Sequence, residues 1–260
     1  MAHTVTTVTK RNAAFDVVLR SHSSKVWSLI NENQWEEGTF NVLDRFLNEN
    51  FSYLDIGAWI GPTVLYGSHI SKHVYALEPD AVAIKELRNN LKLNPAIAAK
   101  VTAIHAALSE KSGTASLYMR SAFGDSSSSL IQTVSDQSCS VKCMTIENLI
   151  NKHRIKDLNF VKIDIEGSEY SLIPSMKPFL ELVKPTLYLS LHPPFLIENL
   201  QRQYHSEAEV QARYNQIVET LIESLQMYKY IYDAAGTRID QQVVLHESNY
   251  REYLFTNEVW

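Results

Sequence analysis

A short apolar run leads into a turn with two glycines in the stretch Tyr53-Leu54-Asp55-Ile56-Gly57-Ala58-Trp59-Ile60-Gly61. Residues 51–56 have the composition of a buried strand, and Pro62 opens a helix at a position where its missing N–H costs nothing. Gly57 permits a tight turn and a close backbone approach, and Gly61 permits close packing of a helix on a strand. The stretch therefore predicts a ligand-binding turn between a strand and a helix.

Strands and helices alternate along most of the chain. This order is typical of a parallel sheet with right-handed crossovers, so we expect an α/β, Rossmann-like fold with helices on both faces. Two strands near the end, joined by a turn, fit an antiparallel pair at the sheet edge. The predicted strands are 51–56, 73–77, 101–107, 160–165, 186–191, 228–232 and 250–256, and the predicted helices are 62 onward, 79–93, 145–153, 169–182 and 198–225.

Two regions depart from this alternation. Residues 113–146 predict an inserted β-hairpin whose long loop contains four consecutive serines, and the loop is either a polar connection or a lid. Residues 1–50 are expected to form an N-terminal helical lead-in, because 23–33 and 40–48 have helical apolar spacing. With no linker in the sequence, residues 51–260 and the lead-in are expected to form a single compact domain.

The charge balance argues against a nucleic-acid partner. The chain has 24 Lys and Arg against 29 Asp and Glu, a net charge of −5, and no basic run. Proteins that bind nucleic-acid phosphates need a positive surface, so a small-molecule substrate is expected. No apolar stretch is long enough to span a membrane, and the N-terminal residues lack the apolar centre of a signal peptide. We therefore expect a cytoplasmic protein with no membrane partner.

The ends of the first three strands predict the ligand. The Gly-x-x-x-Gly spacing differs from the dinucleotide fingerprint, and Asp55 would repel a pyrophosphate. An acid there suits a ligand with an ammonium group and a sulfonium, which describes S-adenosylmethionine. Glu78 ends the second strand, where a carboxylate accepts ribose hydroxyls; the alternative is a solvated strand end. Small residues around Ala106 leave room for a flat adenine ring.

An acidic cluster ends the fourth strand. Asp164, Glu166 and Glu169 stand close together around Gly167, and such a cluster would be self-repelling inside a structural strand. At the carboxyl edge of a parallel sheet, by contrast, ligands bind. We therefore expect these three residues to take part in catalysis, with Asp164 also contacting the cofactor.

His192 ends the fifth strand and has three open interpretations. It is a general base, because imidazole titrates near neutral pH; or a ligand, with Asp164 and Glu166 or Glu169, of a divalent cation such as Mg²⁺ or Mn²⁺; or a structural histidine. The following Pro193-Pro194-Phe195 gives a superficial likeness to a motif of methyltransferases that act on amino groups of bases. That motif belongs after the fourth strand, so we set the likeness aside.

The sequence resembles the FkbM-like family of class I methyltransferases over roughly residues 35–195. Its most specific element is the Asp-x-Glu-Gly-x-Glu signature at 164–169. The matching segments, in order, are 53–61, 78–79, 106–109, Gly113, 126–130, 141–149 and 161–169.

This resemblance implies a mixed seven-stranded sheet with an antiparallel last strand. It implies cofactor contacts from Asp55, Gly57, Ala58, Gly61 and Glu78, and it places Trp35 and Thr39 where they cover the carboxylate end of the cofactor.

The resemblance also implies O-methylation of a carbohydrate, sugar nucleotide or secondary metabolite, with divalent-metal assistance left open. The alternatives are N-methylation of a small-molecule amine or phosphoramidate-type nitrogen, and a non-catalytic cofactor-binding or scaffold protein. A nucleic-acid methyltransferase is disfavoured by charge. The sequence leaves the oligomeric state open, a homodimer included.

Overall fold

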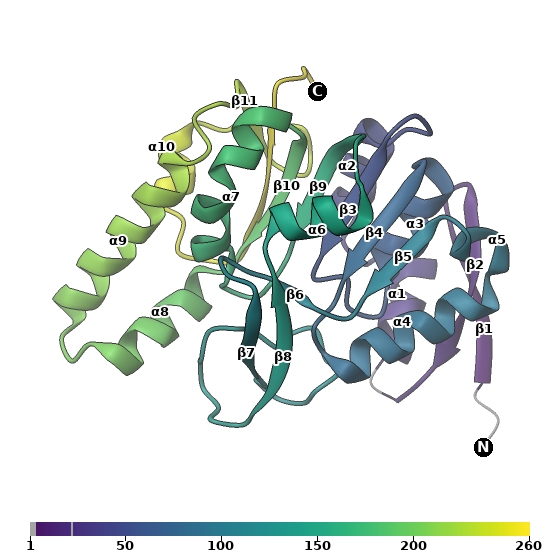
Figure 1. Cartoon of the computed structure of the whole chain (residues 1–260), viewed down its shortest axis with the longest axis horizontal. Helices are drawn as coiled ribbons and strands as arrows, with labels where there is room; N and C mark the ends of the chain where they lie inside the picture. Colours follow the sequence, from purple (N-terminus) through teal and green to yellow (C-terminus); the bar gives the residue numbers. More distant parts are fainter. Residues whose placement is uncertain (1–3, 22) are drawn as a thin grey trace.

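The computed structural model describes residues 4–21 and 23–260, and it arranges them as a central sheet between layers of helices (Figure 1). The sheet has the strand order β11-β12-β10-β9-β3-β4-β5. Neighbouring strands from β10 to β5 are parallel, whereas β12 is antiparallel to both β10 and β11. These pairings confirm the expected mixed seven-stranded sheet. Its strands are β3 (Ser52–Ile56), β4 (His73–Leu77), β5 (Val101–Ile104), β9 (Leu158–Ile163), β10 (Thr186–Leu191), β11 (Tyr230–Tyr232) and β12 (Arg251–Thr256).

Two hydrophobic clusters cover the two faces of the sheet. Along β3, Leu54 and Ile56 point into the cluster that contains α6, α7 and α9, whereas Tyr53 points into the cluster that contains α1 to α4. This alternation follows from the two-residue period of a strand. The helices are α1 (Ser24–Asn31), α2 (Glu37–Phe46), α3 (Pro62–Ile70), α4 (Ala81–Leu93), α5 (Pro95–Ala98), α6 (Ile146–His153), α7 (Glu169–Val183), α8 (Pro193–Gln203), α9 (Glu207–Glu223) and α10 (Gln241–Leu245).

The insertion forms a small sheet of its own, next to the main one (Figure 1). In this sheet β7 (Gly113–Tyr118) pairs antiparallel with β8 (Ser138–Met144), as the hairpin pattern predicts. A short strand, β6 (Ala107–Leu108), pairs parallel with the other side of β8. The strand expected over 101–107 therefore ends at Ile104, because the chain leaves the main sheet to join β8.

The N-terminal segment corrects the expected helical lead-in. Residues 23–50 do contain the helices α1 and α2, but β1 (Thr4–Lys10) and β2 (Ala13–Leu19) form an antiparallel hairpin before them. Threonine and valine dominate β1, and such β-branched residues favour strands. Residues 1–3 of the expected lead-in lie outside the described residues. Among those described, none of the helices combines the length and apolarity needed to cross a membrane.

Candidate active site

A cavity of about 650 Å³ opens at the carboxyl ends of β3, β4, β9 and β10. Parallel strands bring their carboxyl ends to one edge, which is where ligands of such sheets bind. The loop after β7, Tyr250 and five residues of the N-terminal segment complete its walls; the five are Lys25, Val26, Leu29, Trp35 and Glu36. Of the residues predicted from sequence, those that line it are Trp35, Gly57, Ala58, Glu78, Ala106, Asp164, Glu166 and His192.

Gly57 and Gly61 serve packing contacts within the protein. Gly57 has a φ of +86°, and a Cβ there would lie 1.8 Å from the carbonyl oxygen of Asp164. The first turn therefore rests directly on the main chain that follows β9. Gly61 does not line the cavity: a Cβ there would lie 2.4 Å from the side chain of Leu87, so this glycine lets α4, and not a strand, pack close.

Glu78 is buried at the end of β4 and held by main-chain donors. The N–H of Trp59 donates to Oε2 and the N–H of Asp80 donates to Oε1, both at 2.8 Å. Burial raises the pKa of this carboxyl to about 7, although the two hydrogen bonds oppose the shift. A carboxylate oxygen can accept two hydrogen bonds, so each oxygen of Glu78 can still accept one from a ligand hydroxyl.

Asp55 lies behind the cavity wall and does not line it as expected. The hydroxyls of Tyr53 and Thr63 each donate to its Oδ2 at 2.6 Å, and Thr63 is the residue that reaches the cavity. Burial raises the pKa of Asp55, whereas the charge of Lys162 lowers it. Its Oδ1 has no hydrogen-bond partner within residues 4–21 and 23–260. A buried carboxylate oxygen in this state favours a cationic ligand nearby.

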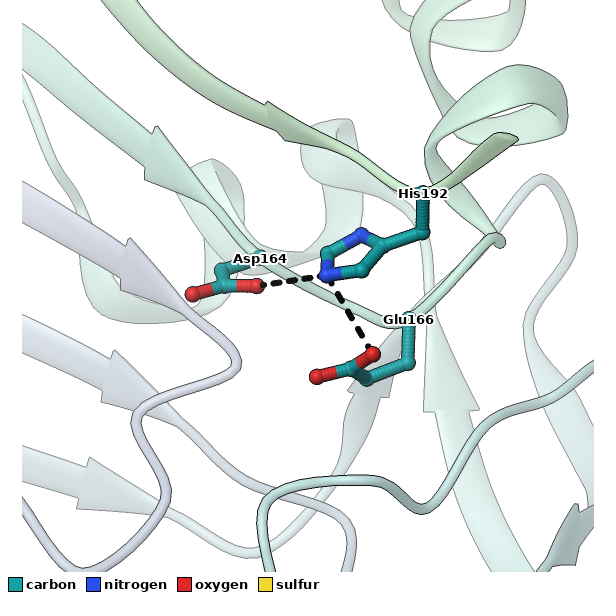
Figure 2. Close-up of side chains that lie close together, drawn as sticks. All are labelled: Asp164, Glu166 and His192. Atoms are coloured by element: carbon teal, nitrogen blue, oxygen red, sulfur yellow. Dashed lines mark ion pairs between the residues drawn. The ribbon is translucent and has the colours of Figure 1, made fainter. Parts of the chain in front are cut away.

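Asp164, Glu166 and His192 converge on one point of the cavity (Figure 2). His192 Nε2 lies 3.2 Å from Glu166 Oε2 and 3.6 Å from Asp164 Oδ1. One donor atom from each of the three residues falls within 4.8 Å of the others. The sequence-predicted catalytic and metal-ligand residues are therefore neighbours in space, and two carboxylates with one imidazole form a donor set suited to a divalent cation.

Glu169 lies behind this group and does not line the cavity. Its Oε1 accepts from His192 Nδ1 at 2.9 Å and from the N–H of Ile165, and its Oε2 accepts from the N–H of Gly167. The turn it braces includes Glu166 and Gly167, both with positive φ. Glu169 therefore orients His192 and the acidic turn, and its predicted part in catalysis would be exerted through these neighbours.

The surrounding carboxylates change the protonation of His192. Burial lowers the pKa of the imidazole, but Glu169, Glu166 and Asp164 together outweigh burial and raise it to about 9. Burial raises the pKa of Glu166 to about 8, with the charge of His192 opposing the shift. The pKa of His192 therefore lies above the neutral range on which the expectation of a general base rested, and the role itself stays a prediction.

Lys162 supplies the buried positive charge beside this group. Its ammonium lies 2.9 Å from Asp164 Oδ2, and the charges of Asp164 and Asp55 raise its pKa despite burial. The sequence could have predicted this ion pair, because Lys162 and Asp164 are two residues apart and residues at that spacing lie on the same face of a strand.

Trp35 and Thr39 take different positions. Trp35 lines the cavity, whereas Thr39 is fully buried and its hydroxyl contacts Tyr188 Oη at 3.0 Å. Between them, Glu36 reaches the cavity. No sequence motif marks Glu36 or Tyr250, because tertiary packing alone brings them to the site.

The loop between β7 and β8 is tied to both sides of the cavity. Trp59 Nε1 donates to the carbonyl of Gly124 at 2.9 Å, and the N–H of Gly124 donates to Asp80 Oδ2 at 2.7 Å. Four residues earlier, Arg120 forms an ion pair with Glu198 on α8. The loop is therefore held as part of the cavity wall, and its role as a lid stays a prediction.

The strand order and the cavity at the sheet edge define a class I methyltransferase-like fold. The family model of the methyltransferase FkbM domain matches residues 55–230, and the chain belongs to this family. No curated protein matches the sequence significantly.

Similar solved structures share little sequence with this chain. Methyltransferase FkbM from Methylobacillus flagellatus KT is 18% identical, with 91% of this chain and 56% of that chain covered and a TM-score of 0.46. This chain thus spans just over half of that protein. TYW2 from M. jannaschii, in complex with AdoMet, is 14% identical (98% and 85% covered, TM-score 0.40). A TehB-like SAM-dependent methyltransferase from Corynebacterium glutamicum is 8% identical (91% and 96% covered, TM-score 0.46).

Proposed function

We propose that this protein is an S-adenosylmethionine-dependent methyltransferase that methylates a hydroxyl of a carbohydrate, sugar nucleotide or secondary metabolite. The supporting observation is that one cavity has Glu78 on one side and the Asp164, Glu166 and His192 group on the other. The first side suits a nucleoside, and the second suits a hydroxyl that must lose a proton. A volume of about 650 Å³ fits small molecules.

Glu78, Ala58 and Ala106 line the cofactor half of the cavity, and the buried Asp55 lies behind its wall. When bound, S-adenosylmethionine supplies a methyl group on a positively charged sulfur. An acceptor oxygen would attack the methyl carbon in line with the carbon–sulfur bond, and the sulfur would leave as a neutral thioether. Glu78 would accept hydrogen bonds from the ribose hydroxyls through the lone pairs that the main-chain donors leave free. Ala106 leaves space for the adenine. Asp55, whose Oδ1 accepts no hydrogen bond from the residues that the structure describes, contributes negative potential behind the sulfonium end.

The acceptor half holds the hydroxyl beside His192. The ring of Phe195 lies 5.5 Å from that of His192, and the ring of Tyr250 lies 4.9 Å from it, so two aromatic walls flank the imidazole. These walls position the acceptor, and positioning lowers the barrier of a bimolecular displacement. Glu166 Oε2 or His192 Nε2 receives the hydroxyl proton once it has lost its own, which their pKa values of about 8 and about 9 favour at alkaline pH or on cation binding.

Asp164, Glu166 and His192 would hold a divalent cation. Glu169 accepts a hydrogen bond from His192 Nδ1, and such a carboxylate partner commonly orients histidines that bind metals. The residues therefore fit a divalent cation. A nitrogen among oxygen donors favours Mn²⁺ over Mg²⁺. A bound cation would lower the pKa of a coordinated acceptor hydroxyl.

The test is binding followed by turnover. We expect calorimetry to detect S-adenosylhomocysteine binding, and radiolabelled methyl transfer to appear on hydroxyl acceptors in a panel of sugars, sugar nucleotides and phenolic or polyketide metabolites. Chelation should lower the rate and Mn²⁺ or Mg²⁺ should restore it.

Each other outcome assigns a different function. Methylation of amine acceptors alone would identify an N-methyltransferase, and tight cofactor binding without turnover on any acceptor would identify a binding or scaffold protein. Full activity in chelator would remove the metal from the proposal.

A further inference from the structure

Glu36 is a strained acidic residue at the cavity wall. It lies directly before α2 with a φ of 41° and a ψ of 50°. These angles fall in the left-handed region, which residues other than glycine rarely adopt. Such conformations cost roughly 1–3 kcal/mol and concentrate at ligand-binding positions. Glu36 also lies outside residues 55–230, the part that matches the family model. The family signature therefore does not account for it.

The surroundings of Glu36 hold its carboxylate in place. The hydroxyl of Thr39, one turn into α2, donates to its Oε2 at 3.2 Å, and the same hydroxyl contacts Tyr188 on β10. The N–H of Thr39 donates to the carbonyl of Glu36 at 2.9 Å. The side chain is thereby directed to the cavity by the start of a well-packed helix.

The charge around Glu36 is unbalanced. Lys162 provides one buried ammonium, and it is bound to Asp164. Glu36 and Asp55 interact with the same ammonium only through its longer-range charge. Asp164, Asp55 and Glu36 thus share the charge of one buried ammonium. Burial and the negative charges of Asp164 and Glu252 raise the pKa of Glu36 to about 8, although Lys162 and the Thr39 hydrogen bond oppose the shift. A cation bound beside Glu36 would stabilise its carboxylate form.

We propose that Glu36 binds the ammonium group of the amino-acid end of S-adenosylmethionine. The inference rests on the proposed function and extends it to a residue of the N-terminal segment. An ammonium beside Glu36 supplies the missing positive charge at hydrogen-bonding distance, and it explains why a glutamate occupies a backbone conformation that suits glycine.

The test compares two ligands that differ in the amino-acid end. S-adenosylhomocysteine carries the ammonium, whereas 5′-methylthioadenosine has the same adenosine thioether without the amino-acid portion. Calorimetry on Glu36→Gln should show S-adenosylhomocysteine binding weakened roughly 10- to 100-fold, as expected for loss of a charge-assisted hydrogen bond, with 5′-methylthioadenosine within about twofold of the wild type.

Glu36→Gly separates binding from stability. Glycine relieves the left-handed strain, so this variant should keep or raise Tm while it loses the same preference for S-adenosylhomocysteine. Glu32→Gln, an exposed acid at the end of α1, is the matched control and should bind both ligands as the wild type does.

The outcomes are distinguishable. An unchanged ratio of the two affinities in Glu36→Gln and Glu36→Gly, with tight wild-type binding of S-adenosylhomocysteine, overturns this inference alone. An equal loss for both ligands also overturns it, because it assigns Glu36 a structural role. Failure of the wild type to bind S-adenosylhomocysteine overturns the proposed function and this inference with it.

Discussion

The two halves of the cavity satisfy their carboxylates in different ways. In the cofactor half, Glu78 receives two main-chain N–H groups, both from rigid turns next to β3 and β4. In the acceptor half, Asp164 and Glu166 face each other and depend on His192 and Lys162 for charge balance.

The difference separates a preformed half from an incomplete one. Main-chain donors at fixed turns hold Glu78 whether or not a ligand is present, so the first half is organised for recognition. The second half brings like charges together, which is unfavourable unless a proton or cation lies between them. In the structure that role falls to the proton of His192.

The largest expected effect is in the acceptor half. Removing the imidazole with His192→Ala, or one charge with Asp164→Asn, should lower the methyl-transfer rate roughly 10²- to 10⁴-fold, the range for loss of acid–base chemistry. S-adenosylhomocysteine affinity of His192→Ala, measured by calorimetry, should stay near that of the wild type. His205→Ala, at an exposed histidine between α8 and α9, is the control. Full turnover in both site variants would leave the acidic group without a catalytic role.

A smaller effect is expected in the cofactor half. Glu78→Gln places an amide nitrogen against one of two N–H donors, so one hydrogen bond is lost and ribose recognition suffers. S-adenosylhomocysteine binding should weaken roughly 10- to 100-fold, while the acceptor KM at saturating cofactor is unchanged. The exposed Glu110→Gln is the control. If acceptor KM changed and cofactor affinity did not, the assignment of the two halves would be reversed.

The third prediction concerns pH. His192 has a pKa of about 9, so a cation that binds its Nε2 must displace a proton at any lower pH. Mn²⁺ affinity should therefore rise with pH from 7 towards 9 and level off above it, with a steeper rise below pH 8, where Glu166 must also lose a proton to bind the cation. Calorimetry in two buffers of different ionisation enthalpy measures the released proton. A pH-independent affinity would exclude His192 from the metal shell.

The smallest effect is expected at the aromatic wall. Tyr250 is 48% exposed and its ring faces His192, whereas its hydroxyl contacts Glu252. Tyr250→Ala should raise acceptor KM roughly 3- to 10-fold without changing cofactor affinity, in line with the energy of an aromatic contact. Tyr250→Phe keeps the ring and should behave as the wild type. Steady-state kinetics that show equal losses in both variants would transfer the role from the ring to the hydroxyl.

The main sheet could be predicted from the sequence because its strands are short apolar runs that end in polar residues. The same logic placed Glu78, Asp164 and His192 at one edge, since the strands are parallel. The side of each strand was harder to assign. Tyr53 and Asp55 are two residues apart and share a face, so the tyrosine hydroxyl bonds to Asp55 behind the cavity wall.

Other features depend on contacts between distant segments. The β1–β2 hairpin is an exception: it is local, it precedes the expected helices, and the β-branched residues of β1 carried a strand signal that the expected helical lead-in overlooked. The elevated pKa of His192 follows from three carboxylates of the segment after β9, which act on an imidazole at the end of β10, and their distances to the imidazole depend on the folded structure. Glu36 and Tyr250 reach the cavity from opposite ends of the chain, and only the packing of α2 on the sheet and the pairing of β12 with β10 bring them there.

The absent side chain of Gly57 has a mechanical consequence. Because the first turn rests on the carbonyl of Asp164, neither turn can shift without displacing the other. In the proposed reaction, main-chain geometry then fixes the distance between the cofactor turn at Gly57 and the acceptor turn at Asp164. Adjustment to acceptors of different size is confined to the rim of the cavity, which α1, the loop after β7 and Tyr250 form. Exchange of rim segments should therefore change which acceptors the enzyme accepts, while the distance between the two turns stays constant.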